Sequence, residues 1–269
     1  MLKRRVLTIL VAAPLCLAAV WLSPPPAFVV LVAACWALAA VEWAHLAGCR
    51  RRPAVAAFAA GIAVLCWALA TVPPCGPGLW LWAAAAAWWM WLTLRVVQAA
   101  RRGPGGPAPV GLTMAAAVPT LVPAAAALAG LQALDPRWAL YALGLVWAAD
   151  IGAYVCGRAW GRRRLAPAIS PGKTWVGFAG GLAAAGLLAW SGPAWLPASA
   201  PARPVLLGLT LLCAAVSVVG DLYISVLKRR AGVKDSGRLL PGHGGLLDRI
   251  DSLNAAAPLF YVGLRCFWS

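Results

Sequence analysis

Residues 204–227 read PVLLGLTLLCAAVSVVGDLYISVL, and the next three residues, Lys228, Arg229 and Arg230, are all basic. A helix that crosses a bilayer needs about 20 predominantly apolar residues, and this stretch is long enough. Its one charged side chain, Asp221, lies near the basic end, where a helix would reach the lipid headgroups. The sequence therefore predicts a transmembrane helix that ends in a charged segment on one side of a membrane.

The composition of the whole chain also indicates a membrane protein. Of the 269 residues, 63% are hydrophobic and 11% are charged, whereas a soluble domain averages about 45–50% apolar and about 25% charged residues. The net charge of +16 is concentrated in short clusters between apolar runs. That pattern is typical of contact with anionic headgroups, and no nucleic-acid partner is expected. The eight cysteines form no CxxC pair, which indicates neither a zinc site nor a disulfide framework.

About nine apolar segments, separated by clusters of Pro, Gly or Arg, are predicted to be transmembrane helices. They cover residues 6–22, 27–48, 54–73, 79–99, 110–133, 138–157, 175–191, 204–227 and 253–268. The first segment follows a basic N-terminus but precedes no small-x-small cleavage site, so we expect a retained helix rather than a signal peptide. The predicted fold class is an all-α, polytopic integral membrane protein. Residues 1–135 are expected to hold about five N-terminal spans, and residues 136–269 a C-terminal catalytic region.

The distribution of basic residues predicts the orientation. If the N-terminus is cytoplasmic and all nine segments cross, all but three of the 23 Lys and Arg side chains face the cytoplasm. The three exceptions are Arg137, Arg203 and Arg265. This asymmetry agrees with the positive-inside rule. The two longest cytoplasmic connections, 158–174 and 228–252, offer most of the polar groups, so the active site is expected at the cytoplasmic ends of the C-terminal helices.

The acidic residues are few, and most of them lie close to those connections. They are Glu42, Asp135, Asp150, Asp221, Asp235, Asp248 and Asp251. An acid inside a membrane span is costly and needs a reason. Asp135 falls in a turn on the other side and is interpreted as ordinary. Glu42 lies one turn before His45, and a structural hydrogen-bonded pair is favoured over a catalytic role.

Two interpretations fit the five remaining acids. They could form salt bridges that balance a basic surface, or they could hold a divalent metal while the cations hold phosphates. Mg²⁺ is typically bound by one or two carboxylates together with substrate phosphates and water. Asp221 shares a helical face with Ser217 and Ser225, and Asp248 shares one with Asp251. The metal interpretation is favoured because salt bridging alone explains neither an acid within a span nor the glycine-rich segment 241–245.

Two loop motifs add candidate phosphate ligands. Ser170-Pro-Gly-Lys173-Thr174 precedes an apolar segment, and backbone N–H groups at a helix N-terminus favour an anion. Lys173 adds a positive charge, although a simple helix cap by Ser170 or Thr174 is an equal alternative, and the spacing is not that of a Walker A motif. His243 lies in PGHGG, where the glycines would let backbone approach a ligand; contact with a phosphate, proton transfer and a structural role stay open.

Residues 225–251, SVLKRRAGVKDSGRLLPGHGGLLDRID, resemble the signature of the phosphatidate cytidylyltransferases, also called CDP-diacylglycerol synthases. The upstream segments 150–158 (DIGAYVCGR), 170–175 (SPGKTW) and 220–222 (GDL) resemble further motifs of that family. Val176 departs from the pattern, because relatives often carry Glu or Gln there. The motif similarity covers about 150–252, and the earlier spans match in hydropathy alone.

The resemblance implies a Mg²⁺-dependent reaction of CTP with phosphatidate that gives CDP-diacylglycerol and pyrophosphate for phospholipid biosynthesis. It implies Asp221 and Asp248 as metal ligands; a second cation is left open. The candidate catalytic residues are Asp221, Lys228, Arg229, Lys234, Asp235, His243, Asp248, Arg249 and Asp251. The candidate substrate-binding residues are Asp150, Tyr154, Arg158, Ser170, Lys173, Thr174, Ser225, Gly244 and Gly245.

The implied setting is the inner cell membrane, with the catalytic face toward the cytoplasm and with CTP, phosphatidate and membrane lipid as partners. The oligomeric state is left open, with a homodimer as one option. A relative with another lipid phosphate as acceptor and, more remotely, a CTP-dependent lipid kinase are alternative enzymes. A transporter would spread its acids through the membrane rather than gather five of seven at one side. A catalytically silent scaffold would not need the full signature.

Overall fold

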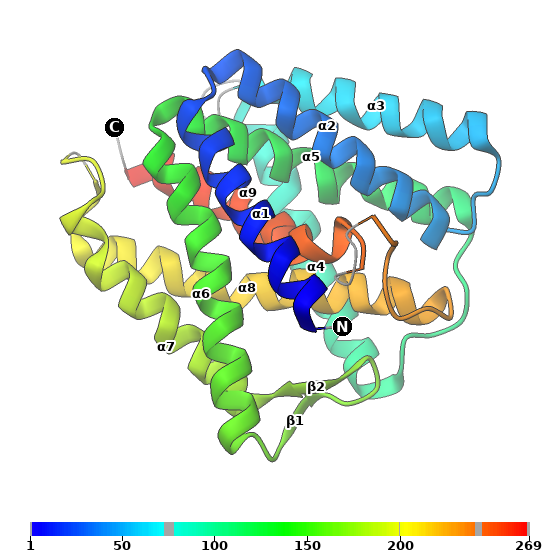
Figure 1. The fold of residues 1–269 in the computed structure, drawn as a ribbon. Helices are drawn as coiled ribbons and strands as arrows, with labels where there is room; N and C mark the ends of the chain where they lie inside the picture. Colours follow the sequence, from blue (N-terminus) through cyan, green and yellow to red (C-terminus); the bar gives the residue numbers. More distant parts are fainter. Residues whose placement is uncertain (1, 73–77, 199, 240–243, 268–269) are drawn as a thin grey trace.

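The computed structural model describes residues 2–72, 78–198, 200–239 and 244–267, which form a bundle of helices with one small hairpin (Figure 1). The helices are α1 (Leu2–Leu22), α2 (Pro25–Leu46), α3 (Arg52–Ala70), α4 (Leu79–Arg102), α5 (Val110–Leu134), α6 (Pro136–Trp160), α7 (Trp175–Ser191), α8 (Arg203–Arg230) and α9 (Leu247–Phe267). The strands are β1 (Arg164–Ala166) and β2 (Ser170–Thr174), and a 3-10 turn covers Gly192–Ala194.

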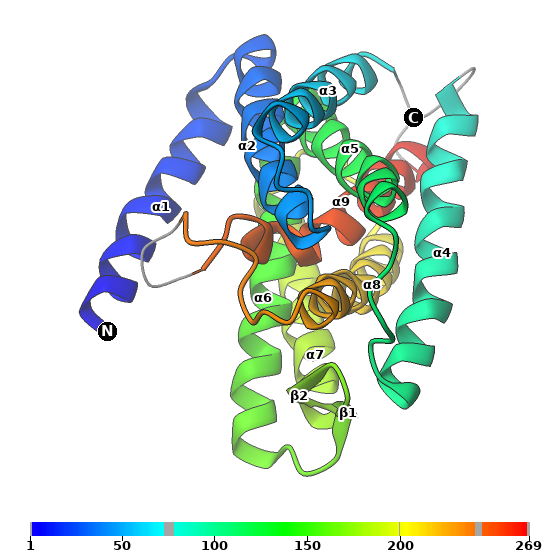
Figure 2. The ribbon, with the colours of Figure 1, turned by 90° about the vertical axis from the view of Figure 1, so that its right-hand side faces the viewer.

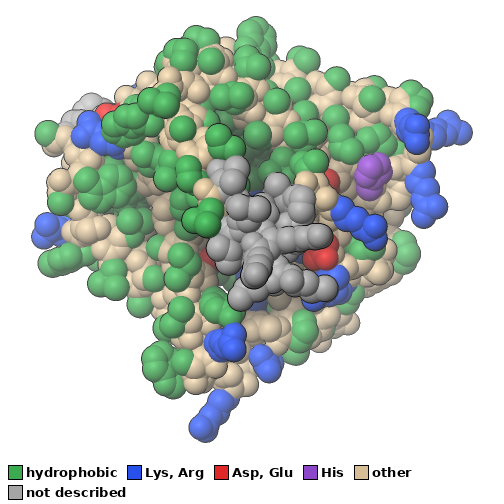
Figure 3. Space-filling view, in the orientation of Figure 1, with side chains coloured by type: hydrophobic (Ala, Val, Ile, Leu, Met, Phe, Trp, Pro, Cys, Tyr) green, Lys and Arg blue, Asp and Glu red, His purple; other side chains and the backbone are tan. Residues whose placement is uncertain are grey.

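Each of the nine α-helices within the described residues overlaps one of the nine predicted segments. Six of them, α2, α3, α5, α6, α7 and α8, are long and apolar enough to cross a bilayer. The prediction of a helical, multi-pass membrane protein is therefore confirmed, while the number of crossings stays a prediction. Hydrophobic side chains are spread over the face in Figure 3, and Lys and Arg occur on it in small groups.

Successive helices alternate in direction, so their ends gather on two opposite sides of the bundle (Figures 1 and 2). On one side, the Gln132 side chain at the end of α5 donates a hydrogen bond to the backbone oxygen of Ser23, just after α1 (2.9 Å). On the other side, Arg230 at the end of α8 donates to the backbone oxygen of Pro104, between α4 and α5 (2.6 Å). The second side also holds the β1–β2 hairpin, and we call it the hairpin side.

Helix α9 lies in the middle of the bundle and packs against α8, α5, α6, α4 and α2. Residues 251–258 are all buried, and the indole N–H of Trp36 in α2 donates to Oδ1 of the fully buried Asn254 (3.0 Å). Because protein rather than lipid surrounds it, α9 tolerates polar residues that a lipid-facing helix would not. This explains why it begins at Leu247, earlier than the predicted residue 253, and why it is not among the six most apolar helices.

Helices α6 and α7 touch backbone to backbone through small residues. A Cβ atom at Gly152 in α6 would lie 2.5 Å from the carbonyl oxygen of Gly180, and one at Gly177 in α7 would lie 2.8 Å from that of Ala153. Small residues spaced by four are the usual means of close helix packing in membranes. The contact fixes one end of α6, the end predicted to face the cytoplasm, against the start of α7. Several candidate site residues lie there.

The segment 158–174 differs from its prediction, because it contains a hairpin and not only loop. Arg164 pairs with Thr174, and Ala166 pairs with Ser170, in an antiparallel register. Ile169, at the turn between the strands, is fully buried and anchors the hairpin. The predicted phosphate loop is therefore strand β2, whose direction is set by pairing with β1.

Candidate active site

An ion pair between Lys173 and Asp221 forms the centre of the candidate site. Lys173 lies near the end of β2, and its ammonium group contacts Oδ2 of Asp221 on α8. The Ser225 hydroxyl, one turn further along α8, lies 3.4 Å from Oδ1 of the same carboxylate. Ser217, predicted on the same face, instead donates to the backbone oxygen of Ala214 (2.8 Å). The hairpin thus places the Lys173 ammonium group beside Asp221 of α8, the second helix after the hairpin in the chain.

Two further acids, Asp150 and Asp251, act electrostatically on Lys173. Burial alone would lower the pKa of the Lys173 ammonium group, yet its pKa is raised above the ordinary value because Asp221, Asp251 and Asp150 are close to it. One carboxylate, that of Asp221, thus pairs directly with Lys173, and those of Asp150 on α6 and Asp251 on α9 act on it electrostatically. Carboxylate oxygens are donors of the kind that Mg²⁺ prefers.

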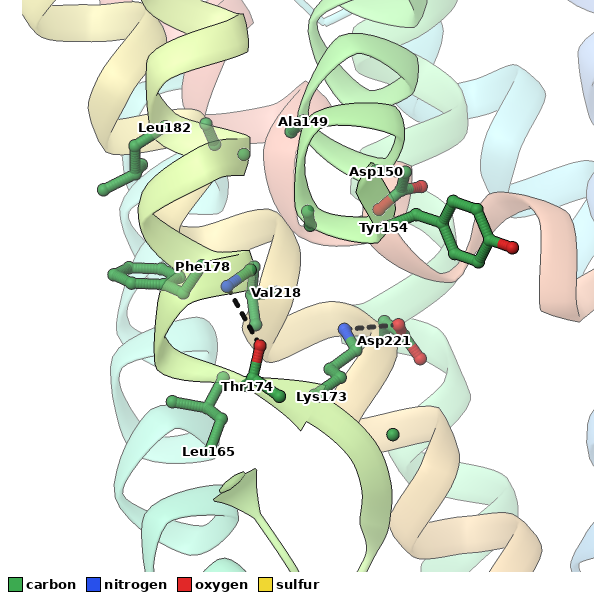
Figure 4. A pocket seen from close by; sticks show the side chains of 15 residues that line it. Ala149, Asp150, Tyr154, Leu165, Lys173, Thr174, Phe178, Leu182, Val218 and Asp221 are labelled. Atoms are coloured by element: carbon green, nitrogen blue, oxygen red, sulfur yellow. Dashed lines mark hydrogen bonds and ion pairs between the residues drawn. The ribbon is translucent and has the colours of Figure 1, made fainter. Parts of the chain in front are cut away.

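A cavity of about 240 Å³ opens beside this cluster, between α6, β2, α7 and α8. Figure 4 shows Asp150, Lys173 and Asp221 toward one end of it, and Phe178 and Leu182 toward the other. The cavity walls thus combine a small number of charged groups with a larger apolar surface. This combination fits an amphipathic ligand whose charged group lies beside Lys173.

A second buried ion pair joins α8 to α9. The Lys228 ammonium group lies 2.6 Å from Oδ1 of Asp248, and both side chains are largely buried. Oδ2 of Asp248 accepts hydrogen bonds from the backbone N–H of Ser236 (2.9 Å), the hydroxyl of Ser236 (3.0 Å) and the backbone N–H of Gly245 (3.2 Å). Asp248 therefore ties both arms of the α8–α9 connection to the start of α9.

The two described glycines of the predicted glycine-rich segment serve this anchor. Gly244 has φ +85°, a left-handed conformation that glycine adopts without strain, and a Cβ there would lie 3.0 Å from Oδ2 of Asp248. A Cβ at Gly245 would overlap with the Ser236 hydroxyl. The backbone thus approaches the chain's own acid at these positions, where the sequence predicted a close approach to a ligand. His243 lies outside the described residues.

Glu42 is a residue of this region whose partner the sequence did not reveal. Its carboxylate accepts hydrogen bonds from the backbone N–H groups of Leu246 (2.9 Å) and Leu247 (2.8 Å) and from the hydroxyl of Ser236 (2.8 Å). It is buried, whereas His45, the predicted partner, is exposed. Glu42 therefore has the structural role that was favoured, but its partners are Ser236, Leu246 and Leu247 instead of His45. One sequence feature pointed to such a partner: Leu246 precedes α9 and has no side-chain oxygen that could cap this helix.

The remaining predicted residues lie around these two ion pairs. Arg158 donates to the Tyr154 hydroxyl (2.7 Å), and Tyr154 lines the cavity. Arg229 donates to the backbone oxygen of Ile169 (3.2 Å) and so attaches α8 to the hairpin. Thr174 caps α7 by accepting a hydrogen bond from the backbone N–H of Gly177 (3.0 Å). Ser170 is half-buried in β2, whereas Lys234, Asp235 and Arg249 are exposed.

The charged groups therefore form two neighbouring centres, one around Lys173 and one around Lys228. Among residues 2–72, 78–198, 200–239 and 244–267, no three acidic, His or Cys side chains converge as a ready-made metal site. The donor chemistry still suits Mg²⁺, which needs one or two carboxylates when phosphates supply the other ligands. Asp221 and Asp248 each offer a carboxylate that is paired with a lysine.

Comparison with known proteins identifies the family of this chain. The model of a family described as "Cytidylyltransferase family" matches residues 3–267. The chain belongs to the cytidylyltransferase family. It is 42% identical over 269 residues to a phosphatidate cytidylyltransferase of Pseudomonas aeruginosa, an alignment that covers 97% of this chain and 96% of the relative.

Other relatives show how far the similarity to cytidylyltransferases extends. A phosphatidate cytidylyltransferase of Haemophilus influenzae is 37% identical over 283 residues, which cover 97% of each chain. One of Bacillus subtilis is 46% identical over 128 residues, which cover 47% of each chain. The predicted family is therefore confirmed, and the similarity reaches well beyond residues 150–252. The N-terminal helices, including the one that carries Glu42, belong to the matched region.

Proposed function

We propose that the chain transfers CMP from CTP to phosphatidate and so produces CDP-diacylglycerol and pyrophosphate for phospholipid biosynthesis. A phosphate oxygen of the lipid attacks the α-phosphorus of CTP, a new P–O bond forms, and the bond to the β-phosphate oxygen breaks as pyrophosphate leaves. The observation that carries the proposal is the cavity with Lys173, Asp221 and Asp150 at its charged end and apolar walls beyond them. Its chemistry matches a lipid with a phosphate headgroup.

Charge neutralisation is the main task of such a site. The reactants bring several negative charges together, and phosphoryl-transfer enzymes act chiefly through positioning and electrostatic stabilisation. Lys173 and Lys228 form ion pairs with Asp221 and Asp248. We propose that both ammonium groups turn toward phosphate oxygens when the reactants bind. Arg229, Lys234 and Arg249 are the further candidates for phosphate contacts.

That exchange would release the carboxylates for Mg²⁺. Asp221 and Asp248 would hold the ion, and Asp150 and Asp251 would orient the cations or complete the set of ligands. When bound, Mg²⁺ neutralises phosphate charge and favours the departure of pyrophosphate. Tyr154, Arg158, Ser170, Thr174 and Ser225 would shape the substrate side of the site, and the roles of Asp235, His243, Gly244 and Gly245 stay predictions, as do a second cation and a homodimer.

A direct assay tests the reaction and its acceptor. The purified protein is expected to move label from [α-³²P]CTP into a lipid product when phosphatidate is supplied, to stop when EDTA is added, and to resume when Mg²⁺ is restored. The labelled lipid and the released pyrophosphate are both measured. Labelled product from polyprenyl phosphate but not from phosphatidate would contradict the proposed acceptor, and activity that persists in EDTA would contradict the proposed metal dependence.

We further propose that the hairpin side faces the cytoplasm of the inner cell membrane, with about nine crossings and a cytoplasmic N-terminus. The basic residues of the connections support this orientation, and CTP is a soluble cytosolic nucleotide. Residues 136–269 would then form the catalytic region, and residues 1–135 would hold about five N-terminal spans.

Cysteine labelling tests this orientation with two exposed positions. In a variant without native cysteines, Arg162→Cys on the hairpin side is expected to resist a membrane-impermeant maleimide applied to spheroplasts. Ala198→Cys on the opposite side is expected to react with it, because that side would face the periplasm. Both positions should react after the membrane is permeabilised. The reverse pattern in intact spheroplasts would overturn the orientation.

A further inference from the structure

Glu42 joins α2 to a segment about two hundred residues away in the chain. The separation between Glu42 and Leu246 is 204 residues, and that between Glu42 and Ser236 is 194 residues. The similarity that identifies the family signature concerns residues 225–251, so Glu42 lies outside it. Within the described part of the chain, the groups that donate hydrogen bonds to its carboxylate belong to the α8–α9 connection or to the first residue of α9. Its environment is thus part of the site, although its helix is remote in sequence.

The first role of Glu42 is that of a helix cap supplied by another helix. The first N–H groups of an α-helix lack partners within the helix, and a nearby carboxylate satisfies them and interacts favourably with the helix dipole. At the start of α9 the preceding residue is Leu246, which cannot cap. The two carboxylate oxygens of Glu42 accept from the N–H groups of Leu246 and Leu247 instead. The direction in which α9 leaves the loop therefore depends on Glu42.

The second role passes through Ser236. Its hydroxyl oxygen lies 2.8 Å from Oε2 of Glu42 and 3.0 Å from Oδ2 of Asp248. The hydroxyl has one proton, which it can donate to one carboxylate at a time, so it links the positions of both acids. A Cβ at Gly237 or Gly245 would overlap with the Glu42 carboxylate. The loop is therefore fitted closely around this side chain.

We infer that Glu42 is a positioning residue, which holds Asp248 and the α8–α9 connection in the arrangement that the reaction requires. It acts through Ser236 and the first turn of α9 and has no contact with the cavity beside Lys173. The inference rests on the proposed role of Asp248. Outer partners of metal-binding side chains orient those ligands, and their loss typically lowers metal affinity or activity by about 10- to 100-fold.

The substitution Glu42→Gln keeps the shape of the side chain but replaces one acceptor oxygen by an amide that donates. Amide exchange is expected to accelerate in peptides covering 244–250, measured by hydrogen–deuterium exchange on the full chain without nucleotide or metal. The half-saturating Mg²⁺ concentration should rise about 10-fold or more and kcat should fall, with the KM for phosphatidate unchanged. His45→Gln, an exposed change one turn later on α2, should leave all four quantities unchanged.

A second variant keeps the test decisive if Glu42→Gln yields little folded protein. Ser236→Ala leaves the two backbone contacts of Glu42 in place and removes only the hydroxyl that contacts both Glu42 and Asp248. It should raise the half-saturating Mg²⁺ concentration without faster exchange at Leu246 and Leu247, and the double variant should lose less than the product of the two single losses. Unchanged Mg²⁺ dependence in Ser236→Ala would overturn the inference. Near-normal activity of Asp248→Asn would instead overturn the proposed site, so the two failures are distinguishable.

Discussion

Replacing Asp221 by Asn is expected to lower the kcat for CMP transfer by at least about 10²- to 10³-fold, the usual cost of removing one electrostatic contact to the transition state. Asn keeps the size of the side chain but removes the charge that faces Lys173 and the proposed metal. The carboxylates of Asp150 and Asp251 still stabilise the Lys173 ammonium group electrostatically, so the folded yield should change little. The measurement is labelled CDP-lipid formed per unit of folded protein in detergent.

The matched control for this prediction is Asp135→Asn. Asp135 is paired with Arg137 on the side of the bundle opposite the hairpin, away from the Lys173–Asp221 and Lys228–Asp248 ion pairs. The same chemical change there should leave kcat unaltered. Asp248→Asn should match Asp221→Asn in its loss of activity, since both acids are proposed ligands. Near-normal turnover in both active-site variants would exclude the assignment of the metal to these carboxylates.

Replacing Gly220 by Ala is expected to reduce both stability and activity strongly. Gly220 precedes Asp221 on α8, and a Cβ at this position would overlap with the backbone oxygen of Asp251 and lie 3.1 Å from the Cβ of Ala255. The atoms in the way are backbone atoms of Asp251 and the Cβ of Ala255, none of which can rotate aside, so the two helices must separate. Overpacking of this kind costs about 1–3 kcal/mol. A displacement of reacting groups by about 1 Å can cost about 10²-fold in rate.

The same substitution at another glycine of α8 provides the control. A Cβ at Gly208 meets no atom within 4 Å, so Gly208→Ala should be neutral or stabilise the helix by about 0.4–1 kcal/mol. The measurements are thermal unfolding in detergent, followed by tryptophan fluorescence, and the rate of CMP transfer at a temperature where all variants are folded. Equal behaviour of the two Gly→Ala variants would show that the α8–α9 contact does not position Asp221.

The positions of the helices could be predicted from the sequence because they depend on local properties. An apolar run and its bounding Pro, Gly or Arg residues locate a helix without knowledge of its neighbours. The predicted segment 175–191 coincides with α7, and the predicted 110–133 differs from α5 by one residue. Helix α9 shows the limit of this method. Its first turns are polar because protein surrounds them, and hydropathy alone placed its start six residues too late.

The site could be predicted as a set of residues but not as a set of contacts. Clustered acids, cations and glycines indicated the candidate residues in the two connections, and their roles stay predictions. The pairing of Lys173 with Asp221 depends on how the hairpin folds back over α6 and α7, which no spacing in the sequence reveals. The capping of α9 by Glu42 likewise joins segments that are distant in the chain. The sequence predicted a hydrogen bond between Glu42 and His45 because spacing identifies neighbours only within the same helix.

The central location of α9 has a consequence for biosynthesis. Helix α9 is synthesised after all the helices that surround it, which are α2, α4, α5, α6 and α8. These helices therefore enter the membrane before the helix that fills the centre of the bundle. Glu42 is among the first acids made, yet its partners Leu246 and Leu247 are synthesised some two hundred residues later. Asp248 and Asp251 arrive with the same late helix. The candidate site is thus completed in one late step, and a nascent chain that stalls before α9 carries Lys173 and Lys228 without Asp248 and Asp251.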